Sequence, residues 1–267
     1  TKQSDVDEWI HTNKPDVIFL AAAKVGGIKA NQEYPAEFLH DNLAIQTNII
    51  HAAYQNNVKK LLFLGSSCIY PKNAPQPLKE EYLLSGAIET TNEAYAVAKL
   101  AGIKLCESYR QQYGCNYISC LPTNLYGPND NYDLESAHVP AALIRRIYEA
   151  NLNGDKIIKI WGTGKPLREF LYVGDLADAC VFLMKNYNKK EPANIGSGEE
   201  ISIQSLANLI ANIIGFEGDI KNDIDMPDGT PRKRLDLSKM DELGWKSKYT
   251  LEDGLKIAYK DFLKFKS

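Results

Sequence analysis

Three short apolar runs separated by long helical stretches constrain the fold of this chain more than any other feature. The runs cover residues 16–23, 61–64 and 117–122, and the helical stretches between them cover 36–55 and 92–113. Uninterrupted apolar runs of this length are typical of strands buried on both faces of a parallel sheet. The order strand, helix, strand, helix, strand therefore predicts a doubly wound α/β fold.

The pattern becomes less regular after Gly127 and Pro128. We expect residues 136–267 to form mainly a smaller α/β domain that binds substrate, interleaved with a nucleotide-binding domain over residues 1–135. The elements expected in this second part are helices over 138–150, 175–186 and 203–214 and a strand over 157–161.

Charge and cysteine content exclude several classes of protein. Lys and Arg total 31 against 34 Asp and Glu, in mixed order, so we expect neither nucleic acid nor a membrane surface as a partner. The five cysteines form no Cys-x-x-Cys pair and lie at no zinc-binding spacing, so no metal site is predicted and a reducing compartment is favoured. No apolar run approaches the roughly 18 residues of a membrane span, and we expect a cytoplasmic protein.

Tyr95 and Lys99 lie four residues apart in the second helical stretch and form a candidate acid–base pair. The spacing places them on one helix face, where an ammonium lowers the pKa of a phenol from its usual ~10. Such a phenol can pass a proton to a carbonyl oxygen near neutral pH. By itself the spacing is also typical of ordinary pairs on a helix surface.

The expected strands end in small and polar residues. These ends cover 21–27, 65–68 and 123–127. Ligands of doubly wound sheets bind beyond the carboxyl ends of the strands, so we expect the chemistry to lie there. The same segments could also be plain strand-end turns.

Taken together, these motifs resemble the extended short-chain dehydrogenases/reductases that act on nucleotide sugars. The resemblance rests on residues 65–71, on the Tyr95-x-x-x-Lys99 pair and on residues 122–128. It implies a Rossmann-like parallel sheet, NADPH/NADP as the cofactor and a nucleotide sugar as the substrate.

Further segments are similar to one group within that family, the GDP-L-fucose synthases. They are residues 21–28, Cys68 after its serine pair, and residues 136–139, 161–170 and 227–233. This similarity covers essentially the whole chain. It implies a GDP-sugar substrate, GDP-4-keto-6-deoxy-D-mannose, which is epimerised at two carbons and then reduced at its ketone with NADPH to give GDP-L-fucose.

The resemblance also implies catalytic roles. Cys68 would be the base and His138 the acid of epimerisation, and both side-chain types titrate near neutrality. In the reduction, Tyr95 would protonate the ketone oxygen, Lys99 would lower the pKa of Tyr95 and hold the nicotinamide ribose, and Ser66 would hydrogen-bond the carbonyl. Each residue also has an ordinary alternative. Cys68 could be a small buried core residue, His138 could simply begin a helix, and the Ser66 hydroxyl could cap a loop.

Binding residues follow from the same resemblance. The residues expected to line the cofactor are Leu64, Gly65, Ser66, Ser67, Lys99, Pro122, Thr123, Asn124, Leu125 and His138. Guanidinium and ammonium groups complement a diphosphate, and an indole can pack on a base or sugar, although a tryptophan is often a core residue. The residues matching substrate positions are Arg146, Trp161, Arg168, Asp228 and Lys233.

The chain departs from the family in one respect. It contains no Gly-x-x-Gly-x-x-Gly turn, and the glycine pairs at 162–164 and 196–198 lack a third glycine. Such a turn opens a helix whose amides bind the cofactor pyrophosphate. We therefore expect a Rossmann-like sheet that lacks its first strands and glycine-rich turn, and weak binding of NADPH by the chain as given.

Oligomeric state and two rival functions complete the predictions. In the family, helices corresponding to 36–55 and 92–113 pair across a dimer axis, which implies a homodimer. One rival is a nucleotide-sugar 4-epimerase or dehydratase, which would keep Tyr95 and Lys99 without needing Cys68 as a base. The other is a non-catalytic nucleotide-sugar-binding protein, suggested by the absent glycine-rich turn.

Overall fold

The computed structural model describes residues 1–134, 136–226 and 228–266. Two residues named above lie outside the described residues. They are Glu135, at the expected domain boundary, and Pro227, the first residue of the segment 227–233.

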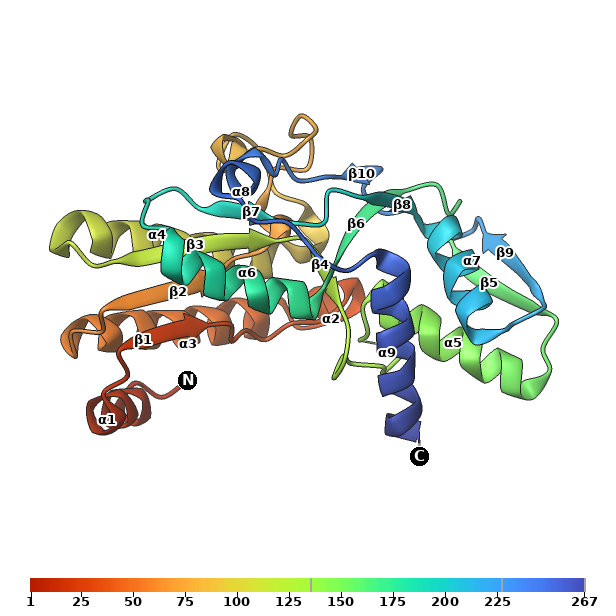
Figure 1. Cartoon of the computed structure of the whole chain (residues 1–267), viewed down its shortest axis with the longest axis horizontal. Helices are drawn as coiled ribbons and strands as arrows, with labels where there is room; N and C mark the ends of the chain where they lie inside the picture. Colours follow the sequence, from red (N-terminus) through yellow and green to blue (C-terminus); the bar gives the residue numbers. More distant parts are fainter. Residues whose placement is uncertain (135, 227, 267) are drawn as a thin grey trace.

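A four-stranded parallel sheet forms the first layer of the molecule (Figure 1). Its strands are β1 (Val17–Leu20), β2 (Lys60–Leu64), β3 (Tyr117–Pro122) and β7 (Ala193–Ile195), in the order β1-β2-β3-β7. Every neighbouring pair is parallel. The predicted α/β class with a Rossmann-like parallel sheet is confirmed, and the last strand comes from the second half of the chain.

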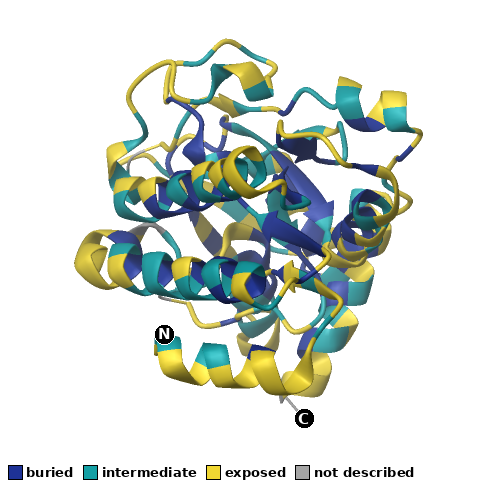
Figure 2. Cartoon of the chain, turned by 90° about the vertical axis from the view of Figure 1, so that its left-hand side faces the viewer, coloured by how far each residue is buried: buried dark blue, intermediate teal, exposed yellow. Residues whose placement is uncertain are grey.

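Helices cover both faces of this sheet. Leu61 and Phe63 of β2 pack into a core with α3 (Pro35–Gln55) and α4 (Glu93–Tyr113), whereas Leu62 packs with α6 (Val173–Asn186). Because successive side chains of a strand point to opposite faces, α6 lies on the face opposite α3 and α4. Figure 2 shows the buried strands between helices whose outer faces are exposed.

The first strand differs from the prediction. A strand buried on both faces is expected over 16–23, but β1 covers only Val17–Leu20, and Val17 and Phe19 are 45% and 44% exposed. Leu20 is buried under α3, so only one face of β1 is covered by the described residues. The exposed side chains of β1 alternate along the strand, which means that one of its faces is uncovered, whereas β7 at the other edge of the sheet is buried throughout.

The second part of the molecule contains two smaller sheets and a helical layer, at the right of Figure 1. In one sheet β6 (Leu167–Tyr172) pairs with β4 (Asn124–Tyr126), β10 (Arg232–Lys233) and, antiparallel, β8 (Glu200–Ser202). The other elements of this part are β5 (Ile157–Trp161), β9 (Asp219–Asp223), α5 (Val139–Asn153), α7 (Ile203–Ile214) and α9 (Leu251–Lys266). Helix α8 (Ser238–Leu243) instead packs beside β7 of the first sheet.

Short helices complete the first part. They are α1 (Gln3–Asn13), α2 (Ile28–Glu33) and the 3₁₀ turns η1 (Ser67–Ile69), η2 (Glu80–Tyr82) and η3 (Thr90–Asn92). Among the helices of the described ranges, none combines the length and the hydropathy that crossing a bilayer requires.

Candidate active site

The carboxyl end of β2 carries Ser66 and Cys68. After Leu64 the chain turns into η1, where the Ser66 hydroxyl accepts a hydrogen bond from the Cys68 backbone amide at 3.2 Å. Gly65 lies between them and the strand, and a Cβ at Gly65 would come within 2.7 Å of Leu121. A side chain here would require Leu121 to move. The Gly65 amide donates to the Cys120 carbonyl at 2.8 Å, so the turn lies close against β3, with Ser66 and Cys68 at the sheet edge.

The first turns of α4 place Tyr95 and Lys99 against the same edge. Lys99 is only 3% exposed, and its Nζ donates a hydrogen bond to the Leu64 carbonyl at 2.7 Å. The Nζ lies 5.9 Å from the centre of the Tyr95 ring and 5.0 Å from that of Phe63. The half-buried Tyr95 is also within hydrogen-bonding reach of the Ser66 hydroxyl. The structure therefore brings Ser66, Tyr95 and Lys99 together.

Burial dominates the electrostatics of this pair. Burial raises the pKa of Tyr95, the nearby Cys68 thiol adds to the rise, and the Ser66 hydrogen bond opposes it. Burial also lowers the pKa of Lys99 to about 8. The pKa of Tyr95 is therefore raised by its surroundings, and the Lys99 ammonium is hydrogen-bonded to the Leu64 carbonyl instead of the phenol. That Lys99 lowers the pKa of Tyr95 during the reaction stays a prediction.

Two cations from the second sheet face Cys68. Arg168 of β6 and Lys233 of β10 are register partners on neighbouring parallel strands. The Nζ of Lys233 lies 3.8 Å from the Cys68 Sγ. Burial lowers the pKa of Arg168, and its interactions with Cys68 and Asp228 oppose that shift. The Cys68 thiol thus lies between η1 of the first part and β10 of the second sheet.

Asp228 fixes the turn after β5. Its two carboxylate oxygens accept hydrogen bonds from the backbone amide and the hydroxyl of Thr163, each at 2.8 Å. Gly162 in this turn has a φ of 69°, and a Cβ there would lie 2.1 Å from the Asp228 carboxylate. Glycine is needed for both reasons. In this structure Asp228 therefore holds the loop.

Trp161 and Arg146 lie beside that turn, in the second part of the molecule. Trp161 ends β5 and is 61% exposed, which contradicts the alternative of a core tryptophan. Arg146 on α5 donates from Nη2 to the Lys159 carbonyl at 2.7 Å. This hydrogen bond ties the guanidinium to the strand that carries Trp161.

The segment expected to line the cofactor bridges the two sheets. Pro122 ends β3 and Asn124 begins β4. The Thr123 amide donates to the Ile195 carbonyl at 2.9 Å, whereas the side chains of Thr123 and Asn124 donate to the carbonyl of Glu169 at 3.2 and 3.0 Å. These residues are fixed at the carboxyl end of the sheet, where the remaining cofactor positions, Leu64, Gly65, Ser67 and Leu125, also lie.

His138 lies immediately before α5 and is exposed. Its imidazole interacts with Asp130, whose pKa is raised by burial, and the imidazole opposes that rise. Within the described part of the chain, no hydrogen bond or ion pair joins His138 to Cys68. The pairing of the two as acid and base stays a prediction.

Sequence reasoning missed Glu169. This residue of β6 is fully buried, at 0% exposure, and accepts hydrogen bonds from two backbone amides. A signal was present, because an acidic residue inside the otherwise mostly apolar strand 167–172 is costly to bury without partners.

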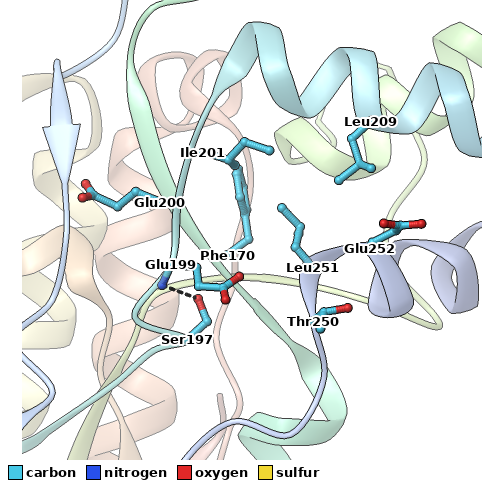
Figure 3. A pocket seen from close by; sticks show the side chains of 9 residues that line it. All are labelled: Phe170, Ser197, Glu199, Glu200, Ile201, Leu209, Thr250, Leu251 and Glu252. Carbon is cyan, nitrogen blue, oxygen red and sulfur yellow. Dashed lines mark hydrogen bonds between the residues drawn. The ribbon is translucent and has the colours of Figure 1, made fainter.

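A cavity of about 350 Å³ lies between β6, β8, α7 and α9 (Figure 3). Its apolar walls come from Phe170, Ile201, Leu209 and Leu251, and its rim carries acidic side chains. None of the candidate catalytic residues lines it. Among the described residues, the chemistry gathers instead around Cys68.

Known proteins resemble this chain over nearly its full length. Residues 1–196 match the NAD dependent epimerase/dehydratase family. GDP-L-fucose synthase 1 of Arabidopsis thaliana is 57% identical over 264 residues, which cover 99% of this chain and 82% of that protein. GDP-L-fucose synthase of Escherichia coli K12 is 49% identical over 267 residues, covering 97% and 83%.

A solved structure agrees with these matches. The GDP-L-fucose synthetase from Naegleria fowleri bound to NADP superimposes with a TM-score of 0.92 at 31% identity. The superposition covers 98% of this chain and 82% of that one.

Proposed function

This chain belongs to the NAD dependent epimerase/dehydratase family, and on that premise we propose that it is a GDP-L-fucose synthase. The reaction is the NADPH-dependent 3,5-epimerisation and 4-reduction of GDP-4-keto-6-deoxy-D-mannose to GDP-L-fucose. The observation that carries the proposal is the meeting of Cys68, Ser66 and Tyr95 at one sheet edge, next to two cations from the second sheet. A simple 4-epimerase would need the phenol but not the thiol.

In the proposed epimerisation, Cys68 and His138 carry protons to and from the sugar. The ketone at carbon 4 acidifies the hydrogens at carbons 3 and 5, so a base can remove each in turn. Lys233, with its Nζ 3.8 Å from the Cys68 Sγ, supports this role by placing a positive charge where negative charge develops on the sugar as the proton leaves. His138 returns a proton on the opposite face, which inverts the carbon.

In the proposed reduction, Tyr95 protonates the ketone oxygen and Ser66 orients it. Burial raises the pKa of Tyr95, so the phenol holds its proton at neutral pH but is a weaker acid than an exposed tyrosine. The hydrogen bond between Ser66 and Tyr95 supports their acting on one oxygen atom. Lys99, buried beneath them, contributes positive potential as negative charge develops on that oxygen.

NADPH, when bound, supplies the hydride that reduces carbon 4. The residues present fit its nicotinamide half in type, because Gly65, Ser66 and Ser67 are small and the buried Lys99 ammonium lies at the same edge, hydrogen-bonded to the Leu64 carbonyl. We propose that these residues, with residues 122–125 and His138, line the cofactor. Backbone amides in a glycine-rich turn, which would hold the pyrophosphate, are not encoded in this sequence.

Substrate binding is proposed for the residues around the second sheet. Arg168 and Lys233 complement a diphosphate, and the exposed indole of Trp161 offers a flat face to a base or sugar. Arg146 and Asp228 complete the set through their contacts beside β5. Residues 1–135 would hold mainly the cofactor and 136–267 mainly the GDP-sugar.

The proposal is tested by following NADPH absorbance with GDP-4-keto-6-deoxy-D-mannose and identifying the product by NMR. One NADPH is consumed for each GDP-L-fucose formed. Turnover of substrate without net oxidation of NADPH would indicate a 4-epimerase instead. GDP-sugar binding by calorimetry without any turnover would indicate a non-catalytic binding protein.

We also propose a cytoplasmic homodimer formed through α3 and α4. The two helices pack side by side, with Gln46 donating to the Ala98 carbonyl at 2.6 Å, and leave Val97 and Tyr113 exposed. All five cysteines are free thiols, which supports a reducing compartment. Light scattering after size exclusion should give twice the chain mass, and a monomer would contradict the dimer.

A further inference from the structure

We propose that the cavity between β6, β8, α7 and α9 binds a small organic cation, an amine or quaternary ammonium group attached to an apolar body. The site is separate from the one assigned to NADPH and the GDP-sugar, because none of the residues proposed to contact either ligand lines it. The inference therefore goes beyond the proposed function and does not depend on it.

The size of the cavity suits a small molecule. Its volume of about 350 Å³ lies within the range of roughly 300–1,000 Å³ that is usual for ligand sites. It equals the volume of roughly ten water molecules at about 30 Å³ each. A single ring with a short side chain fits this space, whereas a helix of another protein, about 10 Å across, does not.

The inner wall of the cavity continues the hydrophobic core of the second part. Phe170 on β6 belongs to this core and is only 5% exposed. Ile201, Leu209 and Leu251 pack against the same core while they line the cavity. An apolar body placed against these four side chains would remove them from water, which is the favourable term of its binding.

The charged side chains that line the cavity are all acidic. The nine residues drawn in Figure 3 include Glu199, Glu200 and Glu252 but no lysine, arginine or histidine. Two of the three acids have cationic partners elsewhere. Glu200 pairs with Arg232 and points away from the cavity, and Glu252 pairs with Lys256 at 2.6 Å.

Glu199 is the acid whose charge is left unmatched. Figure 3 shows its carboxylate directed toward Phe170 and Leu251, two residues of the apolar wall. Across the residues that the structure describes, no ion pair engages this carboxylate. Glu199 is exposed, so it remains accessible to a ligand that enters from solvent.

The side chain of Tyr126 reports the negative potential at this end of the cavity. Burial raises the pKa of its phenol, and three nearby carboxylates add to the rise, those of Asp175, Asp253 and Glu199. The Tyr126 hydroxyl donates to the carbonyl of Leu251 at 3.3 Å, so this potential lies next to the cavity wall. An apolar wall beside an unpaired carboxylate complements a ligand that joins an apolar body to one positive charge, whereas an anion would be repelled.

The test uses phenethylammonium as the probe, with phenethyl alcohol as its uncharged analogue and phenylacetate as an anionic one. Binding to the isotopically labelled full chain is followed by NMR, through the amide shifts of Ile201, Leu209 and Leu251. We expect saturable shifts with a Kd of about 1 mM for the ammonium. Because the carboxylate is exposed, we expect about fivefold weaker binding of the alcohol, and weaker binding still of phenylacetate.

Two variants separate the charge from the apolar wall. Glu199→Gln weakens binding of the ammonium about fivefold and leaves binding of the alcohol unchanged. The matched control is Glu217→Gln, the same charge change at an exposed residue that does not line the cavity, and it leaves both affinities unchanged. Leu209→Trp fills the cavity and abolishes binding of both probes. If that variant does not fold, Ile201→Phe provides the same block.

Equal affinities for the three probes, or equal binding of the ammonium by E199Q and the wild type, overturn the proposal. Shifts of the lining residues that follow chain concentration without any probe also overturn it, because a second copy of the chain would then cover the cavity. The titration needs neither NADPH nor GDP-sugar. A chain that binds the probe as described yet makes no GDP-L-fucose therefore refutes the proposed function and leaves the cation site intact.

Discussion

The buried ammonium of Lys99 makes stability depend on pH in a way that one substitution removes. Lys99→Met preserves most of the side-chain volume and deletes the charge. In the folded chain burial lowers the pKa of Lys99 from 10.5 to about 8, whereas the unfolded chain retains the higher value. The hydrogen bond to Leu64 at 2.7 Å is lost at every pH and shifts the variant by a constant amount.

The sign follows from proton binding. Between pH 8 and 10.5 the unfolded chain holds a proton that the folded chain has released, so the free energy of unfolding of the wild type rises with pH. A shift of this size corresponds to about 3 kcal/mol at 1.36 kcal/mol per unit. The free energy of unfolding of the wild type should therefore rise by about 3 kcal/mol relative to that of K99M between pH 7 and pH 10.5.

Urea unfolding followed by circular dichroism at a series of pH values measures this difference. Lys104→Met is the control, because Lys104 is a lysine of the same helix that pairs with Glu107 at 2.8 Å on the surface. The free energy of unfolding of K104M, plotted against pH, should run nearly parallel to that of the wild type. Parallel curves for K99M and the wild type over the same range would show that Lys99 is not desolvated, and the account of its burial would be refuted.

Three further substitutions separate the steps of the proposed reaction. Cys68→Ser should slow solvent-deuterium incorporation at carbons 3 and 5 by about 10³-fold, because the hydroxyl is a poorer base, and unchanged incorporation would exclude the thiol. Tyr95→Phe should reduce NADPH oxidation by about 10²-fold or more while deuterium incorporation continues, and normal oxidation would exclude the phenol as donor. Asp228→Ala removes both hydrogen bonds to Thr163 and should raise KM for the GDP-sugar about tenfold with kcat within about twofold, and an unchanged KM would show that the turn does not serve binding.

Element types and positions in the first part follow closely from the sequence. The helices expected over 36–55 and 92–113 are α3 and α4, which begin at Pro35 and Glu93. Long periodic segments bounded by turn residues carry strong local signals, which explains this agreement. The strand over 16–23 is shorter and more exposed than expected, because which faces of a strand are covered depends on how the whole chain packs, which local sequence does not encode.

The second sheet could not be predicted in the same way. Residues 124–126 look like a turn after β3, yet they form β4, and the two-residue β10 has no sequence signal of its own. Both strands exist because they pair with β6. The contact between Lys233 and Cys68 joins residues 165 positions apart, so it depends on that pairing.

The electrostatics of the site were the least predictable part. Helical spacing correctly places Tyr95 and Lys99 on one face, but the direction of the Tyr95 shift depends on burial, which local spacing does not reveal. The cation that faces the thiol comes from β10, beyond the helix considered in the sequence. Pairwise motifs thus predict which residues gather, whereas their protonation depends on what surrounds them.

The short segment between β3 and β4 joins the two sheets that carry the residues proposed for epimerisation and for reduction. The proton donors of reduction lie at the end of β2 and the start of α4, in the first sheet, whereas Lys233 beside Cys68 belongs to the second. The chain passes between the two sheets at Thr123, whose amide bonds to β7 and whose hydroxyl bonds to the Glu169 carbonyl. Because both bonds are made by one residue, the sheets cannot shift relative to each other without breaking one of them. Under the proposed function, we expect this constraint to keep the thiol and the phenol at one edge, where a single sugar could reach both.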